Sequence, residues 1–303
     1  MGRSRGQVVL VAALGIAVTL LALGVIANAA VFTEQLATRE TPTGADAIAF
    51  QHAASDGVGG LLALANRYNA SSRSEIESQF RADVADLRSA TIDQSVRYAE
   101  LATVSVRSTT DGTRILQNET RALTNVSGAG NWTLATDVSG VRRFVMNVSQ
   151  DSLGGDRPVT VIVDSKGATW RMTIAPDGGN ARVQTSAGVE CTVSGPSVVV
   201  DLSEGHVAGT ECTDLLVATG VSSPYEVRIR NGTSARGRYL LFARSASVPA
   251  TNYATDPANG PIAAPAIYSA TVHVRVVGPS ITYATNVTVA PEDAPDGAGY
   301  GVV

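Results

Sequence analysis

The spacing of hydrophobic residues changes twice along this chain, so three kinds of segment are predicted. The stretch from Val8 to Phe32 contains no charged residue. At about 1.5 Å per helical residue it would form a helix of about 37 Å, enough to cross the ~30 Å apolar core of a bilayer. Over residues 45–100 apolar residues recur at helical spacing, and from about Leu101 they alternate with polar residues, as in half-buried strands.

The middle segment predicts a helical hairpin over residues 45–100. The sequence Thr41-Pro42-Thr43-Gly44 should separate it from the first helix, because proline cannot continue a helix. Ser74 with Glu77 matches a capping box at the start of the second helix of the hairpin. The apolar residues that follow share one helix face, which predicts a packing surface: Ile76, Phe80, Val84 and Leu87.

The alternating segment predicts a mostly antiparallel, β-sandwich-like domain over residues 101–290, and therefore an α+β chain. Turn signals rich in Gly, Asn and Asp separate the alternating stretches. A long loop is expected over residues 249–265 and a flexible tail over 291–303. The clearest predicted strands are residues 159–163, 170–174, 225–229, 272–276 and 281–289.

The N-terminal segment, residues 1–40, determines where the remainder of the chain resides. Arg3 and Arg5 precede the uncharged stretch, and this charge bias leaves the N-terminus in the cytoplasm and the bulk of the chain outside the cell. The segment could be an uncleaved signal anchor. The small residues Ala27-Asn28-Ala29 also fit a secretory cleavage site, although the apolar stretch exceeds the usual length of about 7–15 residues.

A third interpretation rests on a family resemblance. Arg5-Gly6-Gln7, followed by the apolar helix, resembles the class III signal of archaeal type IV pilins. Residues 5–11 and 31–39 together are similar to the pilin-like surface proteins of halophilic archaea. The resemblance is confined to the N-terminal segment. It implies a basic leader over residues 1–6, cleavage after Gly6 by a prepilin peptidase, and a transmembrane or pilin-type helix over residues 7–40.

In that family the freed helix contacts membrane lipid or packs against other pilin-like subunits in a filament. Bacterial pilins place a glutamate at the fifth mature position, where this chain would have Val11. The resemblance therefore implies a minor or accessory subunit more than a major one.

Composition limits the remaining possibilities. The formal net charge is −4 and no basic face is evident, so nothing supports binding to nucleic acid. The two cysteines, Cys191 and Cys212, would both lie outside the cell, where an even count predicts one disulfide. A metal site would need more ligands than His206 can add to them.

Beyond the apolar segment the chain contains seven Asn-X-Ser/Thr sequons, none with proline in the middle. Their grouping between residues 118 and 147 predicts a glycosylated surface. The seven acceptor residues are Asn69, Asn118, Asn125, Asn131, Asn147, Asn231 and Asn286.

No arrangement of residues predicts catalysis. His52, His206 and His273 are far apart, and the sequence contains no H-E-x-x-H, G-x-S-x-G or glycine-rich phosphate loop. We therefore expect no catalytic residue, metal or cofactor. The leading hypothesis is a pilin-like cell-surface subunit that displays a β-rich domain for adhesion or assembly. The alternatives are a membrane-anchored cell-envelope or binding protein outside any filament, and an exported hydrolase.

Overall fold

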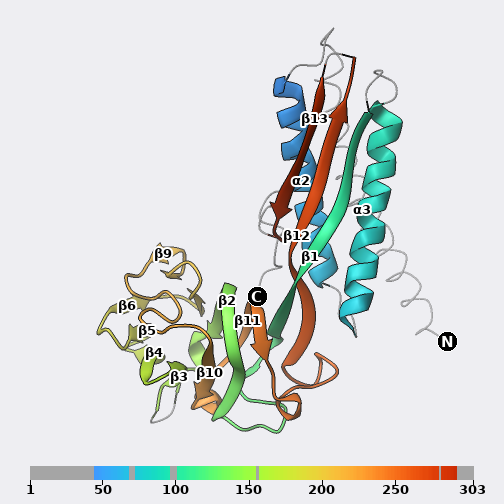
Figure 1. Cartoon of the computed structure of the whole chain (residues 1–303). Helices are drawn as coiled ribbons and strands as arrows, with labels where there is room; N and C mark the ends of the chain where they lie inside the picture. The colour runs from blue at the N-terminus through green and yellow to red at the C-terminus, as the bar shows by residue number, and fades with distance from the viewer. Residues whose placement is uncertain (1–43, 68–71, 96–100, 155–156, 280, 292–303) are drawn as a thin grey trace, which may run out of the picture. The chain divides into compact units, whose positions relative to one another are not determined.

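The computed structural model describes residues 44–67, 72–95, 101–154, 157–279 and 281–291 (Figure 1). The described chain is α+β, with two long helices and a large antiparallel sheet, which confirms the α+β part of the predicted fold. The predicted leader, the helix over 7–40 and most of the tail lie outside the described residues. Among the described helices, none has the length and apolar character needed to cross a membrane.

The described residues form two compact units that do not divide at residue 100. One unit combines residues 44–64, 78–108 and 269–291, and the other combines residues 65–77 and 109–268. The first and last strands of the β-rich segment therefore belong partly with the helices. Both strands were predicted to lie in a separate β-rich domain over residues 101–290.

The first unit contains most of two helices and part of three strands. These are α2 (Gly44–Arg67), α3 (Arg73–Ser95), β1 (Leu101–Ala122), β12 (Ile262–Val277) and β13 (Thr282–Val289). In the sheet, β12 lies between β13 and β1, and the two helices run alongside these strands (Figure 1). The two helices are also close to each other, because a Cβ added to Gly57 would lie 3.5 Å from Cδ2 of Leu87.

Helix α2 packs on one face of this sheet through small and aromatic side chains. Ala47, Ala102 and Val276 form a buried cluster to which Phe50 and Tyr283 add partly buried rings. The Tyr283 hydroxyl also donates a hydrogen bond to the side-chain oxygen of Gln51, which lies on α2. Polar side chains of the alternating pattern lie on the other face of the sheet.

Helix α3 begins earlier than the predicted capping box. The backbone N–H of Glu75 donates to Oγ of Ser72 at 3.3 Å, so Ser72 is the N-cap and Ser74 lies inside the helix. Glu77 instead accepts a hydrogen bond from the Thr109 hydroxyl at 3.0 Å. The prediction of Ser74 as the cap was wrong because Ser-x-x-Glu occurs twice in overlapping register here. The predicted packing face is confirmed, with Ile76, Phe80 and Val84 buried.

The second unit is built around β2 (Trp132–Ser149), which pairs with β11 (Arg236–Ser247), β10 (Tyr225–Arg230) and β7 (Ser197–Asp201). From β10 the sheet continues through β3 (Val159–Ser165), β4 (Ala168–Asp177), β5 (Asn180–Thr185) and β6 (Glu190–Val193). From β7 it continues through the two-residue strands β8 (His206–Val207) and β9 (Thr210–Glu211). Short 3₁₀ turns span Gln150–Ser152, Gly232–Ser234 and Ala250–Asn252.

One hydrophobic core joins these strands. The alternating residues predicted to face inward are buried in β3, β4 and β10, and the same alternation is confirmed in β12. Both tryptophans, Trp132 and Trp170, lie in this core. The loop predicted over residues 249–265 is shorter than expected, because β12 already begins at Ile262 and includes Pro265.

Candidate functional site

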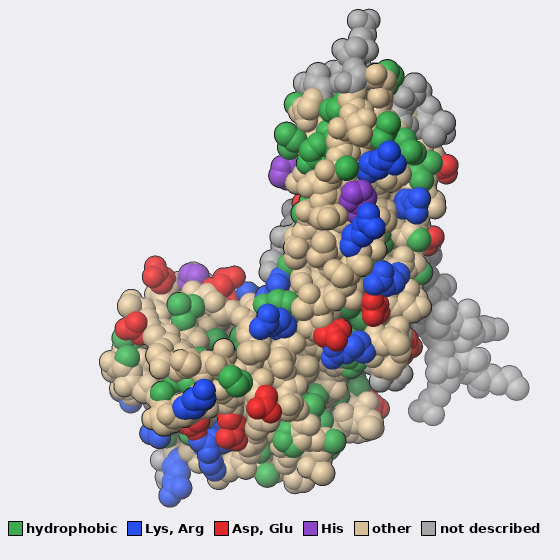
Figure 2. All heavy atoms as spheres, in the orientation of Figure 1, with side chains coloured by type: hydrophobic (Ala, Val, Ile, Leu, Met, Phe, Trp, Pro, Cys, Tyr) green, Lys and Arg blue, Asp and Glu red, His purple; other side chains and the backbone are tan. Residues whose placement is uncertain are grey.

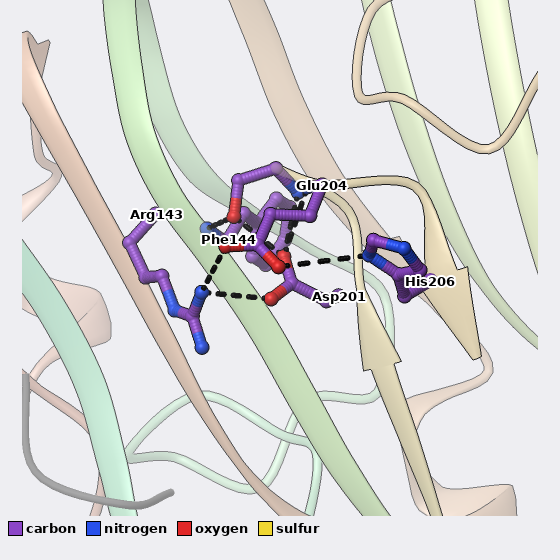
Figure 3. A network of polar contacts seen from close by, with 6 residues as sticks. Arg143, Phe144, Asp201, Glu204 and His206 are labelled. Atoms are coloured by element: carbon purple, nitrogen blue, oxygen red, sulfur yellow. Dashed lines mark hydrogen bonds and ion pairs between the residues drawn. The ribbon is translucent and has the colours of Figure 1, made fainter. Parts of the chain in front are cut away.

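A connected group of polar side chains lies where β2 meets the turn after β7 (Figure 3). Asp201 ends β7, and its backbone carbonyl accepts from the N–H of Gly205 at 2.9 Å to close the turn. Oδ1 of Asp201 accepts three more hydrogen bonds: from the Ser203 hydroxyl at 2.6 Å, from the Ser203 N–H at 3.0 Å and from the Glu204 N–H at 3.1 Å. The carboxylate therefore holds the turn around itself.

Arg143 joins this turn to β2. Its Nη1 lies 2.8 Å from Oδ2 of Asp201 and 3.3 Å from Oε1 of Glu204. Asp201 is buried, and the Arg143 side chain is partly exposed. The charge that Asp201 brings into the protein is thus matched by a guanidinium and by three donors.

The same geometry shows why this group is not a catalytic triad. Nucleophilic catalysis needs a base on the attacking hydroxyl. Ser203 donates its hydroxyl proton to Asp201 and accepts from the Phe144 N–H at 3.2 Å. Nδ1 of His206 lies 3.6 Å from Oε2 of Glu204. The network contains no hydrogen bond between His206 and Ser203 (Figure 3). The arrangement cross-links β2 to the β7–β8 turn.

A shallow hollow of about 440 Å³ lies beside the first 3₁₀ turn of the second unit. Gln150 crosses it, with its N–H donating to the Pro196 carbonyl at 2.9 Å and its side-chain NH₂ donating to the Gly179 carbonyl. Oε1 of Gln150 is buried without a partner. The other residues that line the hollow are Asp151, Leu153, Pro176, Gly179, Asn180, Gly195 and Pro196.

The histidines remain apart in the structure. His52 lies on α2, His206 on β8 and His273 on β12. Across the described part of the chain, no three His, Cys, Asp or Glu side chains come together as a metal site.

The predicted disulfide is confirmed. Cys191 in β6 and Cys212, directly after β9, are bonded, with their Cα atoms 6.3 Å apart. Among the described residues β6 pairs only with β5, and β9 pairs only with β8. Two strand paths lead away from β2, one ending at β6 and the other at β9. The disulfide therefore joins the ends of these two paths.

Three sequon asparagines have structural roles. Asn125 is 9% exposed, and its side-chain NH₂ donates to Oδ1 of Asn252 at 3.1 Å while its Oδ1 accepts from the Ala129 N–H at 2.8 Å. The NH₂ group of Asn231 donates to the Pro158 carbonyl at 3.0 Å. The N–H of Asn231 in turn donates to Oδ1 of Asn131 at 2.9 Å. A sugar on Asn125 or Asn231 would have to be attached to an amide nitrogen that already donates a hydrogen bond to a loop.

The other described sequons lie on strands. Asn147 is half-buried in β2, between β11 and β7. Asn118 and Asn286 are exposed, the first where the pairing of β1 with β11 is interrupted and the second in β13. Asn69 lies outside the described residues, as do the predicted cleavage residues Arg5, Gly6 and Gln7.

Sequence reasoning missed the residues that hold the loops of the second unit. Trp132 donates to the Leu123 carbonyl at 3.1 Å, and its ring packs edge-on against Tyr253 at 5.8 Å between ring centroids. Asn252 donates to the Thr133 carbonyl at 2.8 Å. The only available signal was the presence of Trp132 and Tyr253 themselves, since buried Trp and Tyr need polar partners.

Part of the chain matches a known protein family. Residues 2–131 match a family described as "Family of unknown function (DUF7261)". The matched region includes the uncharged segment, both described helices and β1, and it ends directly before β2. No curated protein and no solved structure matches the chain.

Proposed function

We propose that this chain is a type IV pilin-like cell-surface subunit of the minor or accessory kind. Its N-terminal helix would hold it in the membrane or in a filament after a prepilin peptidase removes residues 1–6. The observation that carries the proposal is the order of the N-terminal segment: Arg3 and Arg5, then Gly6 and Gln7, and then the uncharged stretch from Val8 to Phe32.

The remainder of the chain supports an extracellular location. A disulfide joins β6 to the end of β9, and such bonds persist in oxidising compartments. Exposed sequons at Asn118 and Asn286 suit a surface that could carry glycans. The family match begins at residue 2, so the matched sequence includes the proposed signal together with the helices that follow it.

In this proposal the two described helices form a hairpin that follows the membrane helix. The strands on either side of β2 pack as a β-sandwich over their common core, and this part would be displayed for adhesion or assembly. Charged and polar side chains are distributed over the visible face of the second unit without a single dominant patch (Figure 2). The proposal accordingly names no ligand.

The test is the mature N-terminus, measured by mass spectrometry on full-length protein from its native host. We expect a start at Gln7 and complete retention of the leader in a Gly6→Val variant. Gly2→Val is the matched control, because it adds the same side chain within the leader away from the cleavage site.

An intact leader in the wild-type chain would refute the pilin proposal and favour a membrane-anchored envelope protein. A start near Ala30 would instead indicate secretion after an ordinary signal peptide. Either result would be independent of which sequons carry sugar.

A further inference from the structure

Strand β13 lies at one edge of the sheet, where a strand of another molecule can pair with it. Among the described residues it pairs with β12 alone. Its sequence from Thr282 to Val289, Thr-Tyr-Ala-Thr-Asn-Val-Thr-Val, contains no charge and no proline and is rich in β-branched residues. Edge strands of this composition readily pair with strands of other molecules unless something blocks them.

Edge strands are usually protected by lysine, proline or an inward-facing charge, and β13 has none of these on either face. The distinguishing feature of this edge is the sequon Asn286-Val287-Thr288 near its middle. In Figure 2 uncharged polar side chains and backbone make up much of the surface over β12 and β13. The exposed residues of β13 are Thr282, Ala284, Asn286 and Thr288, and they alternate with the half-buried or buried Tyr283, Thr285, Val287 and Val289.

The Asn286 side chain is arranged to accept a modification on its nitrogen. Its Oδ1 lies 2.9 Å from Nδ1 of His273, the residue directly opposite on β12. Since a carbonyl oxygen can only accept, the ring nitrogen is the donor and the amide oxygen is fixed. The NH₂ group then points away from this contact. In Asn125 and Asn231, by contrast, the NH₂ group donates to the protein.

We propose that Asn286 carries an N-linked glycan and that this glycan shields the free edge of β13 from pairing with a second chain. The inference rests on the proposed export of the chain, because the modification requires that compartment. A glycan on an exposed strand residue is bulky and well hydrated, so it performs the blocking role that a charge performs on other edges.

A second copy paired along β13 would be the competing occupant of this edge. The exposed residues of β13 are small and uncharged, so no side chain of the strand itself would repel that copy. Asn286 itself would lie on the strand next to the added one, where a sugar on its side chain would obstruct pairing.

The experiment uses full-length protein from the native host, solubilised in detergent. Glycopeptide mass spectrometry is expected to find sugar on the peptide that contains Asn286. Thr288→Val removes the sequon while leaving Asn286 and His273 in place, and Asn286→Gln removes the acceptor itself. Thr288→Ser is the matched control, because it changes the same residue and keeps the sequon.

We expect both sequon-removing variants to lose the whole glycan mass at this site and to form more dimers and larger species in light scattering. The control should keep the wild-type glycan and the wild-type size. An unmodified Asn286 in the wild-type chain would overturn the proposal, and so would sequon-removing variants that stay at the wild-type size. Sugar at Asn118 but not at Asn286 would overturn it too, while leaving the proposed export intact.

Discussion

Removal of the Cys191–Cys212 disulfide should destabilise the second unit by a magnitude that follows from its position. The two cysteines are 21 residues apart in sequence. In the chain-entropy model, a bond closing a loop of that size stabilises the native state by about 3 kcal/mol, because it restricts the unfolded chain. We predict this loss for the double variant Cys191→Ala/Cys212→Ala.

The described surroundings of the bond make this estimate specific. Cys212 is 3% exposed and its N–H donates to the Gly205 carbonyl at 2.8 Å, so the turn that carries it is already held by the backbone. Cys191 sits in β6, whose backbone pairs with β5. Most native contacts should therefore survive in the double variant, and the loss should come chiefly from the unfolded state.

The assay is urea unfolding of the full chain in detergent, followed by tryptophan fluorescence. The two tryptophans, Trp132 and Trp170, are 6% and 3% exposed and both lie in the core of the second unit, so their fluorescence reports on that unit alone. A loss of about 3 kcal/mol corresponds to a Tm lower by roughly 6–12 °C for a unit of this size. Reduction of the wild-type protein should reproduce the shift, and the reductant should not affect the double variant.

A loss below about 1 kcal/mol in both experiments would refute the reasoning. It would mean that the unfolded ensemble already keeps the two cysteines close together, or that the strand ends stay closed without the bond.

Two further predictions concern a glycine and the buried phenols. Gly60→Ala should raise the free energy of unfolding of the first unit by about 0.5–1 kcal/mol, because the new Cβ in helix α2 meets no atom within 4 Å. Gly232→Ala is the contrasting variant and should destabilise the protein, since its Cβ would lie 1.9 Å from the Leu123 carbonyl oxygen. Thermal unfolding followed by circular dichroism compares the two variants. Burial raises the pKa of Tyr225 to about 12 and that of Tyr239 well above its ordinary value. Stability from these neutral phenols is complete below the unfolded pKa of about 10 and is lost as the pH rises toward 12, so the urea midpoint should fall over that range and fall less in Tyr239→Phe. A midpoint that stays constant from pH 9 to 12 would contradict this assignment.

The local structure was largely predictable because it depends on short-range spacing. Alternation of apolar residues predicts strands β3, β4, β10 and β12 from residues two positions apart, and burial of those residues follows. The stripe from Ile76 to Val84 works in the same way at helical spacing. The disulfide was predictable because the chain has only two cysteines.

The organisation of the site was not predictable, because it depends on pairs of residues distant in sequence. Arg143 meets Asp201 only because β2 and β7 pair, and no local pattern specifies that register. The structural role of Asn125 depends on Asn252, which is 127 residues away. A sequon motif cannot distinguish that buried asparagine from the exposed Asn286, since both satisfy the same three-residue rule.

The ends of the strand paths suggest a common physical reason for the disulfide and for the sequon on β13. A β-sheet that does not close leaves backbone groups unpaired at its edges, and each edge can recruit another chain. At β6 and β9 the chain places a covalent bond between the two ends, and at β13 it places a sequon on a strand without any charge. A disulfide and an N-linked glycan both depend on the environment outside the cytoplasm. Protein retained in a reducing compartment should therefore lack both protections and associate through these edges, whereas a chain whose edges were guarded by lysine would be indifferent to where it folds.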